Sequence, residues 1–93
     1  MGDRRMAELR TREGSLYVYT HWHGEIMPQL VSQAVQAAES RWDDESYALR
    51  ILVDQITKLG RDQKIGWGLL LRPDAEDEYN HDQPSIIVDL RTG

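Results

Sequence analysis

The chain contains no cysteine and no phenylalanine, and it has only three prolines. Without cysteine there is no disulfide framework, no thiolate zinc site and no cysteine nucleophile, and this composition fits a reducing cytosol. The apolar runs are far shorter than the roughly 20 residues that a membrane-spanning helix needs. No apolar stretch follows the basic opening residues, so we expect no secretory signal. The predicted location is cytoplasmic, without a membrane contact.

Positive charge is also scarce, because 11 lysines and arginines face 16 aspartates and glutamates, for a formal net charge of -5. Binding to nucleic acid depends on cations that neutralise phosphates, so we expect no direct nucleic-acid binding. The 93 residues and the 40% apolar content suit one compact α+β domain, residues 1–93, with a single core.

Familiar catalytic motifs are missing as well. The sequence has no phosphate-binding Walker loop, no G-x-G-x-x-G, no H-E-x-x-H and no G-x-S-x-G elbow around any serine. We therefore predict a protein that is not an enzyme and that carries no cofactor.

The hydrophobic periodicity predicts the order ββααββ. Residues 4–20 form a hairpin, in which Leu16, Val18 and Thr20 share one face of the second strand. A helical pair covers residues 27–59, with Pro28 in the first turn of one helix and Gly60 after the end of the other. A strand pair covers residues 64–90. The expected fold is α+β, an antiparallel sheet of about four strands with two helices packed on one face.

Two details of this fold bear on function. Gly66 and Gly68 leave space on one face of their strand, where a ring or a ligand could lie close. The face of the sheet away from the helices would carry apolar side chains and favour a homodimer through the sheet. Its members are Tyr17, Tyr19, Leu70 and Ile87.

The most distinctive segment is Tyr19-Thr20-His21-Trp22-His23, at the junction between the second strand and the first helix. A loop at such a junction presents side chains to solvent while its ends are held, so these residues are candidates for binding a ligand or a partner. His21 and His23 have a spacing that can place two imidazoles on one metal, with His81 as a third ligand. Two histidines alone do not define a tetrahedral site, so we expect them to face solvent or to be hydrogen-bonded.

Acidic side chains are concentrated in two segments. One opens the second helix, where Asp43 or Asp44 can cap it, and the other follows the third strand. The second segment lacks the central glycine of a calcium-binding EF-hand loop, so we predict a solvated loop. Together they form a candidate surface for a partner with a basic groove, composed of Asp43, Asp44, Glu45, Asp74, Glu76, Asp77, Glu78 and Asp82.

Three short patterns, the Tyr19-Thr20-His21-Trp22-His23-Gly24 turn, the Arg41-Trp42-Asp43-Asp44 corner and the Gly66-Trp67-Gly68 strand, resemble a family of short, uncharacterised bacterial and phage proteins. The resemblance covers roughly residues 16–90. His23 is this chain's own variation on the family turn. The family brings no activity with it, but it implies a phage-like or mobile-element origin. Small acidic proteins of such origin often act stoichiometrically, for example against a host defence complex, as anti-CRISPR proteins do.

Three functional hypotheses follow. The first is a non-catalytic, anti-defence binding protein whose acidic surface opposes a basic groove on a protein partner. The alternative is a protein that binds or sequesters a nucleotide-like ligand in a pocket at the His21-Trp22-His23 turn. The third is a metal-dependent enzyme that uses His21, His23 and His81.

Overall fold

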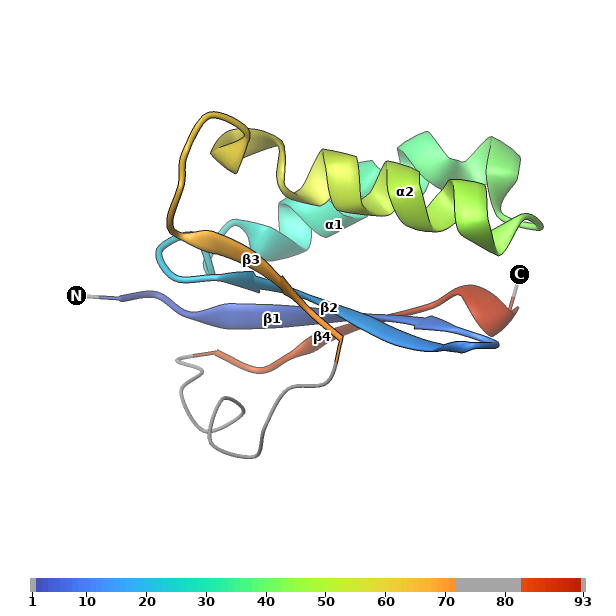
Figure 1. Cartoon of the computed structure of the whole chain (residues 1–93), viewed down its shortest axis with the longest axis horizontal. Coiled ribbons are helices and arrows are strands. Elements are labelled where there is room, and N and C mark those ends of the chain that lie inside the picture. The colour runs from blue at the N-terminus through green and yellow to red at the C-terminus, as the bar shows by residue number, and fades with distance from the viewer. Residues whose placement is uncertain (1, 72–82, 93) are drawn as a thin grey trace.

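The structure, a computed structural model, describes residues 2–71 and 83–92 and confirms the predicted α+β fold with two helices and four strands. Both helices lie on the same side of the sheet (Figure 1). Short 3-10 turns follow each helix and the last strand. The elements are β1 (Arg5–Thr11), β2 (Gly14–Thr20), α1 (Met27–Ala38), α2 (Glu45–Ile56), β3 (Trp67–Leu70) and β4 (Ile86–Asp89).

The four strands lie in the order β3-β2-β1-β4. The pairs β1–β2 and β2–β3 are antiparallel, as predicted, but β1 and β4 are parallel, so the sheet is mixed. The two C-terminal strands are therefore not a hairpin, because they lie at opposite edges of the sheet. Alternation of apolar residues predicts which side of a strand is buried, but it carries no information on the direction of its neighbour.

The core lies between the helices and one face of the sheet. Alternation places Ala7, Leu9 and Val18 on this face, and all three are completely buried. The opposite face carries Tyr17, Tyr19, Leu70 and Ile87 as predicted, because their register positions fall between those of the core residues. We call this the second face.

The helices begin where the sequence predicts. Met27 starts α1, with Pro28 in its first turn, where the missing N–H has no partner to lose. Asp44 caps α2, and its side chain accepts a hydrogen bond from the Tyr47 N–H at 3.4 Å. However, α2 ends at Ile56 instead of Leu59. The Thr57 hydroxyl donates to the Val53 carbonyl at 2.6 Å, and the chain continues as a 3-10 turn.

Neither helix has the length and apolar content needed to cross a membrane, and residues 2–71 and 83–92 include no other helix that does.

Candidate functional site

The turn at residues 20–24 is held between two distant parts of the chain. The His21 N–H donates to the Gly66 carbonyl at 2.9 Å, while the His21 carbonyl accepts from the Asp3 N–H at 2.7 Å. The Gly24 N–H donates to the Asp3 carbonyl at 2.8 Å. Because its backbone groups are paired on both sides, the turn presents its side chains in fixed directions.

At this turn the His21 ring contacts the side chains of Tyr19 and Trp22. The Tyr19 hydroxyl lies 3.0 Å from His21 Nδ1, and the His21 ring meets the Trp22 ring edge-on at a centroid distance of 4.8 Å. The Trp22 side chain is 44% exposed and rests on Gly66. A Cβ atom at Gly66 would lie 2.6 Å from Trp22 Cζ3, so the space predicted beside this glycine is filled by a ring.

His23 points to a different part of the molecule. Its ring stacks on Trp67, with centroids 5.6 Å apart and an interplanar angle of 19°. His23 Nδ1 and Trp67 Nε1 are buried, and neither has a hydrogen-bond partner in the described part of the chain. His21 and His23 thus pack against different rings. No cluster of three metal-ligating side chains occurs within residues 2–71 and 83–92, and the third candidate, His81, lies outside them.

A network of polar side chains also holds the turn in place, and it was not predicted from the sequence. The Asp3 carboxylate accepts from the Glu25 N–H at 2.8 Å and from the Gln83 side-chain amide at 2.6 Å. The Arg5 guanidinium donates to the Gly24 carbonyl at 3.2 Å and to Gln83 Oε1 at 2.9 Å. The contacts with Gln83 join residues 78 and 80 positions apart, and the other two join residues 19 and 22 positions apart, so no local pattern could have revealed them.

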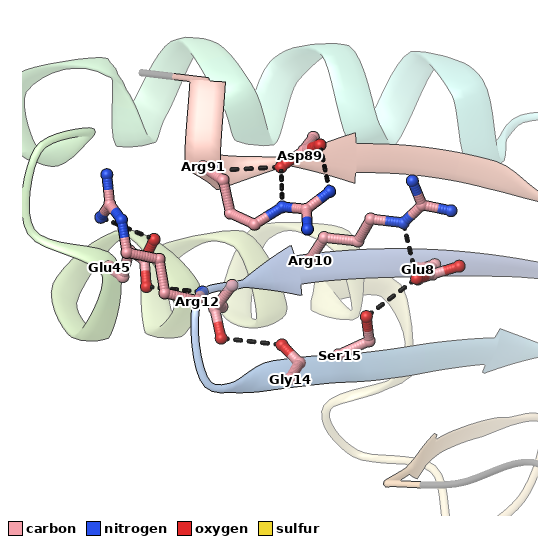
Figure 2. Close-up of polar contacts among 9 residues, drawn as sticks. Glu8, Arg10, Arg12, Gly14, Ser15, Glu45, Asp89 and Arg91 are labelled. Atoms are coloured by element: carbon pink, nitrogen blue, oxygen red, sulfur yellow. Dashed lines mark hydrogen bonds and ion pairs between the residues drawn. The ribbon is translucent and has the colours of Figure 1, made fainter.

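The three acids at the start of α2, which we call the acidic corner, have unequal roles. Asp44 is the helix cap described above. Glu45 accepts two hydrogen bonds from Arg12, one from its N–H and one from its guanidinium, each at 3.0 Å (Figure 2). Asp43 and Asp44 are exposed, and so is the neighbouring Tyr47, at 55%. Arg41 lies over the Tyr47 ring, 5.8 Å from its centroid.

The turn at residues 20–24, which we call the aromatic turn, does not lie beside the acidic corner. The turn follows Thr20, at the end of β2, whereas Glu45 is bonded to Arg12, next to the start of β2. The seven residues of β2 span roughly 20 Å at about 3.3 Å per residue. The remaining predicted acids, Asp74, Glu76, Asp77, Glu78 and Asp82, lie outside the described residues.

A row of paired charges on the second face was also not predicted from the sequence (Figure 2). Glu8 accepts from Arg10 at 2.7 Å and from the Ser15 hydroxyl at 2.8 Å, and Arg91 binds Asp89 through two nitrogens, each at 2.9 Å. The Arg10 hydrogen bond holds the pKa of Glu8 below its ordinary value. Arg91 lowers the pKa of Asp89 to about 2. For Glu8 and Arg10 a signal was available, because opposite charges two positions apart in a strand share a face.

Two grooves follow α2 on the side of the sheet that carries the helices. One, of about 460 Å³, lies between α2 and Leu16, and the other, of about 210 Å³, lies between the end of α2 and β3. Val53 and Thr57 line both grooves, so the two grooves adjoin each other, and we call them together the α2 groove.

No protein-family model matches this chain, and no match was found among curated proteins or solved structures. The family resemblance of the turn, the corner and the glycine strand therefore stays a prediction.

Proposed function

We propose that this chain is a non-catalytic binding protein that engages a basic groove on a protein partner through the acidic corner. The observation that carries the proposal is the exposure of Asp43 and Asp44 beside the exposed ring of Tyr47. Carboxylates around an aromatic anchor combine charge complementarity with a residue type that is enriched among binding hot spots.

The corner is also rigid, which favours binding. Asp44 is tied to the first turn of α2, and the bond between Glu45 and Arg12 holds that turn against the β1–β2 hairpin. A surface that is already ordered loses little conformational entropy when it binds. Its charges would speed and orient the encounter with a basic partner, and this contribution weakens as salt screens it.

The two carboxylates whose pKa values are lowered, Glu8 and Asp89, do not have the properties of a general acid. Arginine lowers the pKa of both Glu8 and Asp89, so both stay ionised near neutral pH. A carboxyl group that acts as a general acid near neutral pH needs the opposite shift. Glu8 also accepts a hydrogen bond from Ser15, which links β1 to β2.

The nucleotide-binding alternative at the aromatic turn has weaker support. The ring of His23 is stacked on Trp67, and the Trp22 ring rests on Gly66, so two of the three predicted ligand-binding rings are already engaged. The anti-defence role depends on the family resemblance alone and stays a prediction.

The experiment is a capture assay with immobilised protein and bacterial lysate at about 50 and about 300 mM salt. The test variant, Asp43→Asn with Asp44→Ser, removes two charges and keeps a capping side chain. The matched control, Glu25→Gln with Asp62→Asn, removes two exposed charges that lie away from the corner. We expect the wild type and the control to retain the same protein at low salt, and the test variant to lose it. Retention that is independent of salt, or equal in both variants, would overturn the proposal.

A further inference from the structure

The outer edge of β3 is unpaired within the described part of the chain, because β3 is the terminal strand of the sheet. The bond from the His21 N–H to the Gly66 carbonyl fixes the alternation of the β2–β3 ladder. In an antiparallel ladder every second residue directs its N–H and C=O groups away from its neighbour. These groups therefore point outward at Trp67 and Leu69.

This edge carries exposed apolar side chains at positions where edge strands usually have residues that prevent pairing with another strand. Leu69 is 52% exposed, Leu71 is 81% exposed and Ile65, just before the strand, is 68% exposed. Edge strands are normally guarded by charges, proline or a bulge, since an exposed apolar edge is a template for pairing with another strand. In addition, the α2 groove runs directly beside Leu69.

We propose that a second copy of this chain occupies the edge and the groove. In this dimer the two β3 strands pair antiparallel around a two-fold axis near Leu69, and the two α2 helices pack side by side across it. Such an interface is isologous, because each copy contributes the same surface.

The spacing of the layers fits this arrangement. The α2 groove is lined by Leu16 of β2 at one end and by Leu69 of β3 at the other, so one side of α2 borders these two strands. Paired strands are about 4.8 Å apart, so the axis lies about 2.4 Å beyond β3. A helix centred between β2 and β3 lies about 4.8 Å from this axis. The two α2 helices would then be about 10 Å apart, which is the distance at which helices pack.

Charge complementarity identifies the second copy as the occupant. Arg50 and Asp54 lie one turn apart on the side of α2 that lines the groove, on either side of Val53. Val53 and Leu69 line the same part of the groove. A two-fold axis near Leu69 therefore passes close to Val53, with Arg50 on one side and Asp54 on the other. In antiparallel helices this places Arg50 of one copy opposite Asp54 of the other, twice. Among the described residues Arg50 has no ion-pair partner, whereas Asp54 pairs with Arg61 at 2.8 Å.

This interface differs from the dimer through the second face that the sequence predicts. There, the charges of Glu8, Arg10, Asp89 and Arg91 are already paired within one copy. Moreover, the second face offers side chains only, while the β3 edge also offers backbone hydrogen bonds. The acidic corner lies at the start of α2, so the dimer proposal can fail without affecting the proposed function, and the reverse also holds.

The absence of cysteine allows a direct test of the geometry. Two Leu69 residues that face each other across the axis in a hydrogen-bonded pair would have Cα atoms about 5.5 Å apart, within the range that a disulfide bridges. We expect Leu69→Cys to form a covalent dimer under mild oxidation at micromolar concentration. Ile87→Cys, equally exposed at 52% but on the second face, should stay monomeric on a non-reducing gel.

Light scattering then tests the energetics. We expect the wild type and Ile87→Arg to be dimers at about 100 μM, and Arg50→Glu to weaken dimerisation at least about tenfold. Arg50→Glu combined with Asp54→Arg restores opposite charges and should recover much of that loss. A monomeric wild type at this concentration overturns the proposal. So does cross-linking through Ile87→Cys but not Leu69→Cys, which would assign the dimer to the second face.

Discussion

Replacing Gly66 with alanine should lower the free energy of unfolding more than replacing Gly68 with alanine. Gly66 has φ +93°, a conformation that side chains with a Cβ adopt only at a cost of about 1–3 kcal/mol. The new methyl group would also lie 2.6 Å from Cζ3 of Trp22 and 2.7 Å from Cε3, so the indole must move off the strand. Displacing this half-exposed indole from its contact adds about 1 kcal/mol.

Gly68 provides the matched control. It lies in β3, two residues after Gly66, its φ is not positive, and a Cβ atom there would meet no atom within 4 Å. Alanine at this position should therefore be neutral or slightly stabilising, because it restricts the unfolded chain more than glycine does. We expect the two variants to differ by about 2–4 kcal/mol in the free energy of unfolding.

The assay is urea unfolding followed by far-ultraviolet circular dichroism, with a thermal melt alongside. For a domain of this size, 1 kcal/mol shifts the melting temperature by about 4–8 °C. A double-mutant cycle with Trp22→Ala separates the two causes, because without the indole only the backbone strain at Gly66 remains. Equal unfolding free energies for Gly66→Ala and Gly68→Ala would refute the reasoning.

The remaining predictions concern the helix cap, the row of paired charges and the buried imidazole. Asp44→Ala should cost about 1 kcal/mol and Asp44→Ser much less, by urea unfolding, because serine can still accept the capping hydrogen bond. The folded-state pKa of Asp89 is about 2, below its ordinary 3.8, so its ion pair stabilises the fold above pH 3.8. The difference in urea midpoint between wild type and Asp89→Asn should shrink as the pH falls from 4 to 2, and a difference at pH 2 as large as that at pH 5 would contradict this. His23→Phe should be at least as stable as wild type, because it removes the unpartnered Nδ1 while keeping a ring on Trp67. His21→Phe should lose about 1 kcal/mol, because His21 Nδ1 faces the Tyr19 hydroxyl.

Local chemistry accounts for what could be predicted from the sequence. The starts of both helices were predictable because Pro28 and Asp44 act within a single turn. The face of each strand was predictable because apolar residues alternate, which places Val18 in the core and Tyr17 opposite. The space at Gly66 followed from the missing side chain, although only the structure shows that Trp22 fills it.

What could not be predicted depends on contacts between distant residues. The parallel pairing of β1 and β4 requires knowing that β4 lies at the edge opposite β3, and no residue type encodes that choice. The same holds for the network of Asp3, Arg5 and Gln83 beneath the aromatic turn. Each of these side chains resembles an ordinary surface residue until its partner, some 80 positions away, is placed beside it.

The two proposed surfaces have a joint consequence. In a dimer that pairs along β3, the antiparallel α2 helices carry the two acidic corners at opposite ends, because each corner lies at the start of its helix. A surface coated with the basic partner would then be bound bivalently, and bivalent binding strengthens apparent affinity by about 10²–10⁴-fold. We therefore expect Leu69→Arg to weaken binding to the coated surface while leaving the affinity for a single partner in solution unchanged. Asp43→Asn with Asp44→Ser should weaken both. If Leu69→Arg weakened both to the same extent, the β3 edge itself would contact the partner, and the division of the molecule into a pairing edge and a binding corner would be wrong.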